Sequence, residues 1–114
     1  MFRINPLGGK IEPVATGFVG TTGIAVSPRS GTVYVAELFG GAGGTGQVSV
    51  VQPGANTPTP LIALSSPAAI ELHHGSLYVT TDAFSPDATG NPQPIGKITI
   101  VPLTGRGHSE DDGN

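Results

Sequence analysis

The fold is decided by residues 22–37, which read TGIAVSPRSGTVYVAE. Two short runs of apolar and β-branched residues flank a turn that contains Ser, Pro and Gly, a pattern typical of an antiparallel β-hairpin. A second hairpin of the same type follows in residues 69–79, AIELHHGSLYV, where the pair His73-His74 replaces the longer turn. The chain therefore contains an internal repeat, and its two copies are offset by 44 to 46 residues.

Each copy continues into a third strand. GQVSVV at residues 46–51 matches GKITIV at residues 96–101. Upstream, residues 3–7 resemble the end of a still earlier third strand, and a fourth element at residues 11–16 recurs near residues 60–64. Four short strands in roughly 45 residues is the period of one β-propeller blade.

The pattern predicts an all-β chain of about two four-stranded antiparallel propeller blades within residues 1–106. The blade cores are expected at about 23–64 and 68–103, with 2–16 as the end of a preceding blade and 107–114 as a disordered acidic tail. A sandwich or barrel, which also uses seven to nine short strands, is the alternative, and the repeat favours the propeller. The nine expected strands are 2–6, 10–16, 23–27, 32–38, 46–52, 59–64, 68–73, 76–82 and 96–102.

Composition supports a folded, loop-rich protein. The 114 residues include 18 glycines and 11 prolines, and only 11% of residues are charged, which excludes a helical bundle or coiled coil. Residues 1–106 hold equal numbers of acidic and basic side chains, so the net charge of −3 comes from Glu110, Asp111 and Asp112. Without a basic face, nucleic acid is not an expected partner.

The sequence says little about the cellular compartment. No apolar run approaches the length of a membrane span, so no membrane partner is expected. The absence of cysteine excludes disulfides and thiolate metal sites. Residues 1–6 contain no apolar core of a signal peptide, an observation that means little if the chain is a processed piece of a longer protein.

Residues 22–37 resemble the core of an NHL-repeat blade, in which an apolar strand, a Pro/Gly turn and a strand such as VYVAE recur. Over about residues 10–103, with Gly46-Gln47-Val48 after a Gly-rich stretch, the chain is similar to ScyD/ScyE-type secreted propellers. It more distantly resembles gluconolactonase and strictosidine-synthase-like propellers. The resemblance implies six blades and secretion, whereas this chain carries about two blades.

Two blades cannot close a ring, and open blades expose strand edges and apolar faces. We therefore expect self-association, with a homotrimer that completes a six-bladed ring favoured. The predicted strand 2–6 is a difficulty, because it would compete with a neighbour's strand 96–102 for one position. One of the two strands must be displaced, or the chain is a piece of a larger secreted propeller.

The gluconolactonase resemblance implies a divalent cation such as Ca²⁺ at the channel mouth, held by several oxygen ligands. The metal-ligand candidates are Glu37, Asp82 and Asp87, with Asn91 as a further oxygen donor. Glu37 aligns with Thr81 in the second copy, so the carboxylate is not repeated. The alternative interpretation of Glu37 is a solvated acid at the mouth of a loop.

Loops that follow the second strand of each blade suggest a ligand rim formed by Phe39, Phe84 and Asn91. The Gly-rich loop 39–46 precedes a strand rather than a helix, which excludes a phosphate-binding loop and leaves a flexible connection. His73 and His74 are expected on an exposed turn with side chains that point apart. No catalytic triad is visible. With no Trp and both tyrosines in expected strand cores, a lectin is disfavoured.

These observations favour a non-catalytic binding or scaffold module that assembles with other copies. The alternative function is a metal-dependent lactonase-type hydrolase, or its remnant, with Glu37 and Asp82 as metal ligands. The second alternative is a piece of a larger propeller without a function of its own.

Overall fold

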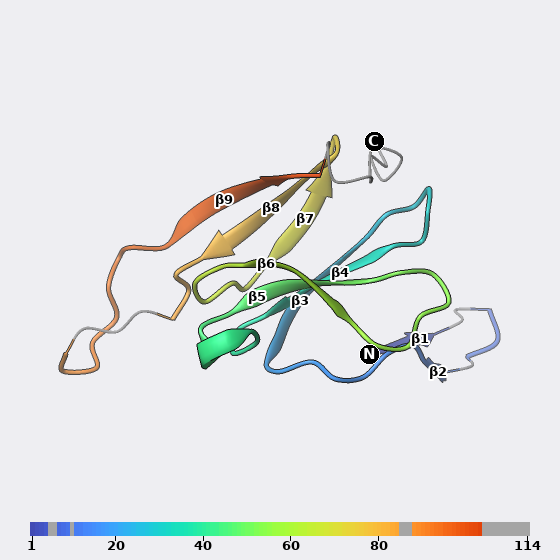
Figure 1. Cartoon of the computed structure of the whole chain (residues 1–114), viewed down its shortest axis with the longest axis horizontal. Coiled ribbons are helices and arrows are strands. Elements are labelled where there is room, and N and C mark those ends of the chain that lie inside the picture. The colour runs from blue at the N-terminus through green and yellow to red at the C-terminus, as the bar shows by residue number, and fades with distance from the viewer. Residues whose placement is uncertain (5–6, 10, 85–87, 104–114) are drawn as a thin grey trace.

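The computed structural model describes residues 1–4, 7–9, 11–84 and 88–103. Over these residues the chain is all-β, and its strands form three open antiparallel sheets (Figure 1). The expected tail 107–114 and Asp87 lie outside the described residues. The elements are β1 (Phe2–Ile4), β2 (Ile11–Pro13), β3 (Thr21–Val26), β4 (Val33–Glu37), the 3-10 helix η1 (Ala42–Gly44), β5 (Gln47–Val51), β6 (Thr59–Ala63), β7 (Ile70–His73), β8 (Ser76–Thr81) and β9 (Lys97–Pro102).

The strand order follows the chain within every sheet. A four-stranded sheet has the order β3-β4-β5-β6, a three-stranded sheet has the order β7-β8-β9, and β1 pairs with β2. All nine predicted strand positions are confirmed, although β2 is shorter than the expected 10–16. β2 ends at Pro13, although the N–H of Val14 still donates to the carbonyl of Met1 at 2.9 Å.

Turn residues fix the register of the two repeated hairpins. His74 and Gly75 both have positive φ, 48° and 75°, the pattern of a type I′ turn that matches the twist of the strands. The β3–β4 turn is longer and closes with Gly31 at φ 80°, where its N–H donates to the carbonyl of Ser27. The different turn lengths explain why the repeat offset varies.

The main core lies between the four-stranded and the three-stranded sheets, which Figure 1 shows stacked one above the other. We call the side of the four-stranded sheet that carries Tyr34, Val48 and Val50 the covered face. It packs against Leu77, Val79, Val101 and their neighbours on the three-stranded sheet. Because side chains alternate along a strand, the opposite side of each sheet presents a different set of residues.

The two sheets approach most closely near β3. A Cβ at Gly23 would lie 2.5 Å from the carbonyl oxygen of Ala68, so only glycine fits there without movement. The hydroxyl of Thr22 donates to the carbonyl of Ala68 at 2.9 Å and ties β3 to the segment before β7. These contacts hold the three-stranded sheet in place on the covered face.

The β1–β2 hairpin lies beside the opposite side of the four-stranded sheet, which we call the rear face and which carries Ile24, Val26, Val33 and Val35. At two consecutive pairs its register repeats that of β5 and β6. The equivalent cross-strand pairs are Phe2 with Pro13 and Ser49 with Pro60, and Arg3 with Glu12 and Val50 with Thr59. At these two pairs the hairpin therefore pairs like the outer two strands of the four-stranded sheet.

Candidate functional site

Glu37, the first metal-ligand candidate, is a buried structural residue at the end of β4. Its Oε1 accepts the backbone N–H of Val19 at 2.9 Å. Its Oε2 accepts Nε2 of Gln47 at 3.1 Å and the hydroxyl of Ser49. Both carboxylate oxygens therefore have protein donors, as a buried carboxylate requires.

The interpretation of Glu37 as a solvated acid at a loop mouth is wrong. The chain folds back over the carboxylate at Gly40, where a Cβ would lie only 2.9 Å from the Glu37 Cβ and Oε1. The segment before β3 covers it from another side, since Leu38 donates its N–H to the carbonyl of Gly20 at 2.7 Å. Burial of Glu37 results from these two close approaches.

The second sheet places a similar but neutral pair at the equivalent positions. Thr81 and Thr99 take the places of Glu37 and Ser49, and their hydroxyls hydrogen bond at 2.9 Å. The repeat therefore uses a cross-strand polar contact at this point in both sheets. In the four-stranded sheet this contact includes a carboxyl group, that of Glu37, whereas in the three-stranded sheet it joins two hydroxyl groups.

Asp82, the second candidate, follows β8 and is held by an ion pair. Its Oδ2 lies 2.9 Å from Nζ of Lys97. The hydrogen bond from Lys97, and after it one from the Ser65 side chain, lowers the pKa of the Asp82 carboxyl below its ordinary value. The backbone of Asp82 is also fixed, because its N–H donates to the carbonyl of Ser65 at 2.7 Å.

The candidate ligands that lie within the described residues are not part of a metal-binding cluster. Glu37 belongs to the four-stranded sheet and Asp82 follows the three-stranded sheet, while Asp87 lies outside the described residues. Among the residues that the structure describes, no three His, Asp or Glu side chains gather as a metal ion would need. A cation site built from these carboxylates remains a prediction.

Two of the three predicted rim residues are exposed aromatic side chains. Phe39 and Phe84 both project from loops after a second strand, as expected. Phe39 packs against Gly20, where a Cβ would lie 2.9 Å from its ring. Asn91 donates to the hydroxyl of Thr89 at 3.0 Å within its own loop.

The turn and the Gly-rich loop differ from their predictions. His73 and His74 are exposed as expected, but their ring centroids lie 4.0 Å apart, so the prediction that they point apart is wrong. The left-handed backbone at His74 brings the rings together. The Gly-rich loop folds into a compact turn around η1, where the N–H of Gly46 donates to the carbonyl of Gly40 at 2.9 Å.

The sequence interpretation missed the outer side of the three-stranded sheet, which we call the open face. It presents a row of apolar side chains to solvent: Tyr78 is 37% exposed, Ile98 70% and Ile100 55%. The residues at the equivalent positions on the covered face are Tyr34 at 0%, Val48 at 0% and Val50 at 5%. The expectation that both tyrosines lie in strand cores is wrong for Tyr78.

The register explains why these residues share the open face. Tyr78 lies opposite Ile100, and Thr80 lies opposite Ile98. Beside them on β7, Glu71 lies opposite Tyr78. The repeat itself carried the signal, since aligning Tyr34 with Tyr78 predicts that both need a covering layer.

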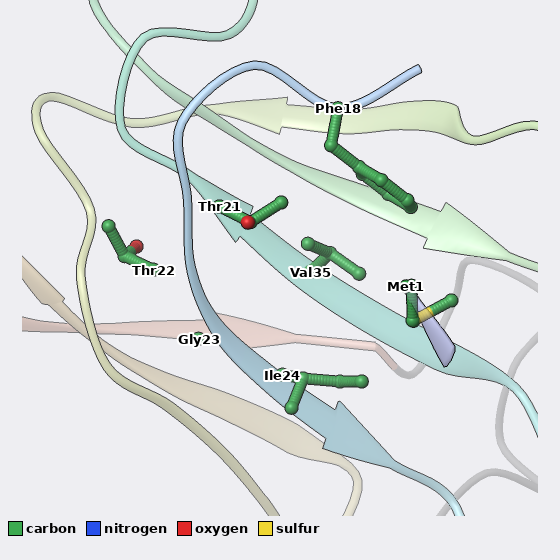
Figure 2. A pocket seen from close by; sticks show the side chains of 7 residues that line it. All are labelled: Met1, Phe18, Thr21, Thr22, Gly23, Ile24 and Val35. Atoms are coloured by element: carbon green, nitrogen blue, oxygen red, sulfur yellow. The ribbon is translucent and has the colours of Figure 1, made fainter. Parts of the chain in front are cut away.

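The rear face of the four-stranded sheet contains the other incompletely filled surface. A hollow of about 310 Å³ lies between Phe18, Ile24, Val35 and Met1, whose side chains surround it in Figure 2. A second hollow of about 450 Å³ lies between the β1–β2 hairpin and the same face, next to Val26 and Val33. Ile24 and Val26 remain half exposed there.

Comparisons with known proteins supply no family. The chain matches no family model, and no curated protein shows significant similarity to it. Within the described residues, no helix has the length and apolar character needed to cross a membrane. The two incomplete surfaces, the open face and the rear face, are the features of the molecule that point to a function.

Proposed function

We propose that this protein is a non-catalytic binding and scaffold module of propeller-type sheets that joins further copies of itself in a closed ring, with a trimer favoured. The observation that carries the proposal is the open face. Positions that are buried on the covered face are exposed at the equivalent places on the second sheet. A sheet with this pattern is suited to stacking under another sheet.

The hydrophobic effect favours association through the open face. Apolar surface removed from water contributes about 25 cal/mol per Å². Tyr78, Ile98 and Ile100 form one contiguous row across β8 and β9, whereas scattered surface apolar residues would need no explanation. A partner layer that covered this row would remove it from water. That burial would stabilise the association, just as burial of the covered face stabilises the main core.

The favoured number of copies comes from the propeller resemblance. Each chain contributes two repeated sheets and the separate β1–β2 pair. Three such chains would provide six sheets, the number in the propellers that the sequence resembles. A head-to-tail contact between different surfaces closes into a ring when the rotation between copies permits it.

The test is the mass in solution, measured by light scattering after size exclusion over a dilution series. A trimer that persists on dilution supports the proposal. A folded monomer over the whole concentration range contradicts it and favours a piece of a larger propeller.

The alternative, a metal-dependent hydrolase, has its own test. A cation that binds only the folded state increases the free energy of unfolding by RT ln(1 + [L]/Kd). The melting temperature rises as a result. We expect equal melting temperatures in Ca²⁺ and in EDTA, because the oxygens of Glu37 already have donors. Stabilisation by Ca²⁺ that disappears in an Asp82→Asn variant would support the hydrolase instead.

A further inference from the structure

We propose that β1 occupies, within one chain, the position that β9 of a second copy takes in the assembled ring. On assembly the neighbour's β9 pairs with β2, β1 is displaced, and the neighbour's open face lies on the rear face of this chain. This inference rests on the proposed function and specifies its interface. The occupant of the open face is therefore a second copy of the chain.

β1–β2 and β5–β6 share part of their register. At two consecutive pairs, β1 and β2 have the same residue separations as the part of β5 and β6 that follows the register shift after Val48, so we assign β2 to the place of a fourth strand. The three-stranded sheet has β9 at its edge and no fourth strand among the described residues. A fourth strand without its sheet and a sheet without its fourth strand are complementary.

The two competing strands, β1 and β9, are unequally attached to their own chain. All three residues of β1 are exposed, and Arg3 of β1 and Glu12 of β2 form an ion pair at the surface. Surface ion pairs contribute little to stability. In contrast, β9 pairs with β8 over six residues and buries Val101 in the main core. β1 is therefore the strand that gives way.

The rear face of the four-stranded sheet has space beside it. The two hollows there are lined by Ile24, Val26, Val33 and Val35, and Met1 and Phe2 from the β1–β2 hairpin border them. These rear-face positions are equivalent to Ile70, Leu72, Leu77 and Val79, which fill the contact with the covered face. The contact between the two sheets of one chain is thus a template for the contact between copies.

The template also fixes the register between copies. By analogy with Val50 opposite Thr59, Ile100 of one copy lies opposite Glu12 of the next. Thr99 then lies opposite Pro13, as Ser49 lies opposite Pro60. The exchange replaces the three-residue strand β1 with the longer strand β9 of the neighbour. The apolar side chains Ile98 and Ile100 of β9, which are exposed in the single chain, would become covered.

Disulfide trapping tests this register, because the chain has no cysteine of its own. We would combine Glu12→Cys with Ile100→Cys in one chain and oxidise the protein. Directly opposed residues of antiparallel strands have Cα atoms about 4.5–5.5 Å apart, within the range of a disulfide. Both side chains are at least partly exposed, so the variant should fold. We expect covalent oligomers on a non-reducing gel.

The matched control combines Glu12→Cys with Tyr78→Cys. Tyr78 lies opposite Ile100 on the next strand, so its Cα would be about 10 Å from Glu12 in the proposed interface, too far for a disulfide. We expect this control to remain monomeric on the same gel. Equal cross-linking of both pairs would indicate non-specific collision and would overturn the register.

A second variant tests displacement of β1. Adjacent residues of a strand direct their N–H groups to opposite sides, so Arg3→Pro with Ile4→Pro removes a donor from the β1–β2 ladder. If β1 occupies the edge of β2 about nine-tenths of the time, weakening β1 lowers the apparent dissociation constant for a second copy about tenfold. Weaker association of this variant would overturn the inference.

The outcomes separate this inference from the proposed function. An oligomer by light scattering without the Glu12–Ile100 cross-link refutes the strand exchange and leaves the scaffold function standing. A monomer that forms no cross-link refutes both. Cross-linked oligomers together with tighter association of the proline variant support both.

Discussion

The four-stranded and the three-stranded sheets carry the same sequence repeat but occupy different environments. The four-stranded sheet has the three-stranded sheet on its covered face and the β1–β2 hairpin beside its rear face. The three-stranded sheet is covered on one side only, so Tyr78 is partly exposed where Tyr34 is buried. The comparison teaches that the repeat encodes two apolar faces per sheet, and that only the neighbouring layer turns a face into core.

The polar positions follow the same rule. In the four-stranded sheet the charged Glu37 is enclosed and has protein donors on both oxygens. In the three-stranded sheet, Thr81 and Thr99 form a neutral contact, and the charge lies one residue further on, at Asp82, paired with Lys97. A buried charge requires fixed donors, whereas a partly exposed charge can use a lysine and water.

The largest effect on stability is expected when a carboxylate is introduced on the covered face and compared with one introduced at the equivalent place on the open face. Val48→Asp places a carboxylate in the main core without a partner and should lower the free energy of unfolding by at least about 3 kcal/mol. Ile98→Asp, at the equivalent exposed position, should leave the monomer folded but prevent association. Chemical denaturation and light scattering measure the two effects. Equal destabilisation by both would show that the open face is part of the folding core.

The second comparison concerns the two polar contacts. Glu37→Ala removes the acceptor of three donors, including the N–H of Val19, and should cost about 3 kcal/mol. Thr81→Ala breaks one hydrogen bond and should cost about 1 kcal/mol. Urea denaturation measures both. As a control, Glu37→Gln keeps the shape and one acceptor and should fall between them. A neutral effect of Glu37→Ala would contradict its structural role.

The third comparison uses the close approach of the sheets. Gly23→Ala puts a methyl group against the carbonyl of Ala68 and should destabilise the chain by about 1–2 kcal/mol. At the equivalent exposed position, Ala69→Val should change stability by less than about 0.5 kcal/mol. Melting temperatures compare the two. If Gly23→Ala left the melting temperature unchanged, the backbone at residue 23 would not lie as close to the carbonyl of Ala68 as the structure places it.

The smallest effect is expected from the ion pair of Asp82. Its lowered pKa means that the folded state binds the proton less readily than the unfolded state, so this pair stabilises the fold above the ordinary pKa. That contribution is lost as the pH falls below about 4, the ordinary value for Asp, through the lower folded pKa. Asp82→Asn tolerates the left-handed backbone found there, at φ 55°.

Thermal melts of the wild type and of Asp82→Asn between neutral and acidic pH measure this difference. The curves should differ slightly at neutral pH and converge in acid. If the variant lost more stability in acid than the wild type, the ion pair would not be the source of stability that is lost in acid. The matched variant Lys97→Met should show the same convergence, because it removes the other partner of the pair.

Much of the fold was predictable because the repeat is local. The strands, their order and the hairpin at His73-His74 follow from short alternating runs bounded by turn residues. The candidate site was less predictable. Glu37 follows a strand in sequence, which suggested a loop mouth, but its burial depends on Gly40 and Gly20, whose close approaches have no signal in a single sequence.

The sequence by itself determined the all-β class, the meander order and the residues that occupy equivalent places in the two sheets, because alternation and turn chemistry act over a few residues. Only the tertiary structure decided which equivalent faces are covered. Burial depends on the layer that lies opposite, and that layer comes from distant segments. Tyr34 and Tyr78 therefore share a pattern and a strand position, and differ because a sheet covers the first and solvent reaches the second.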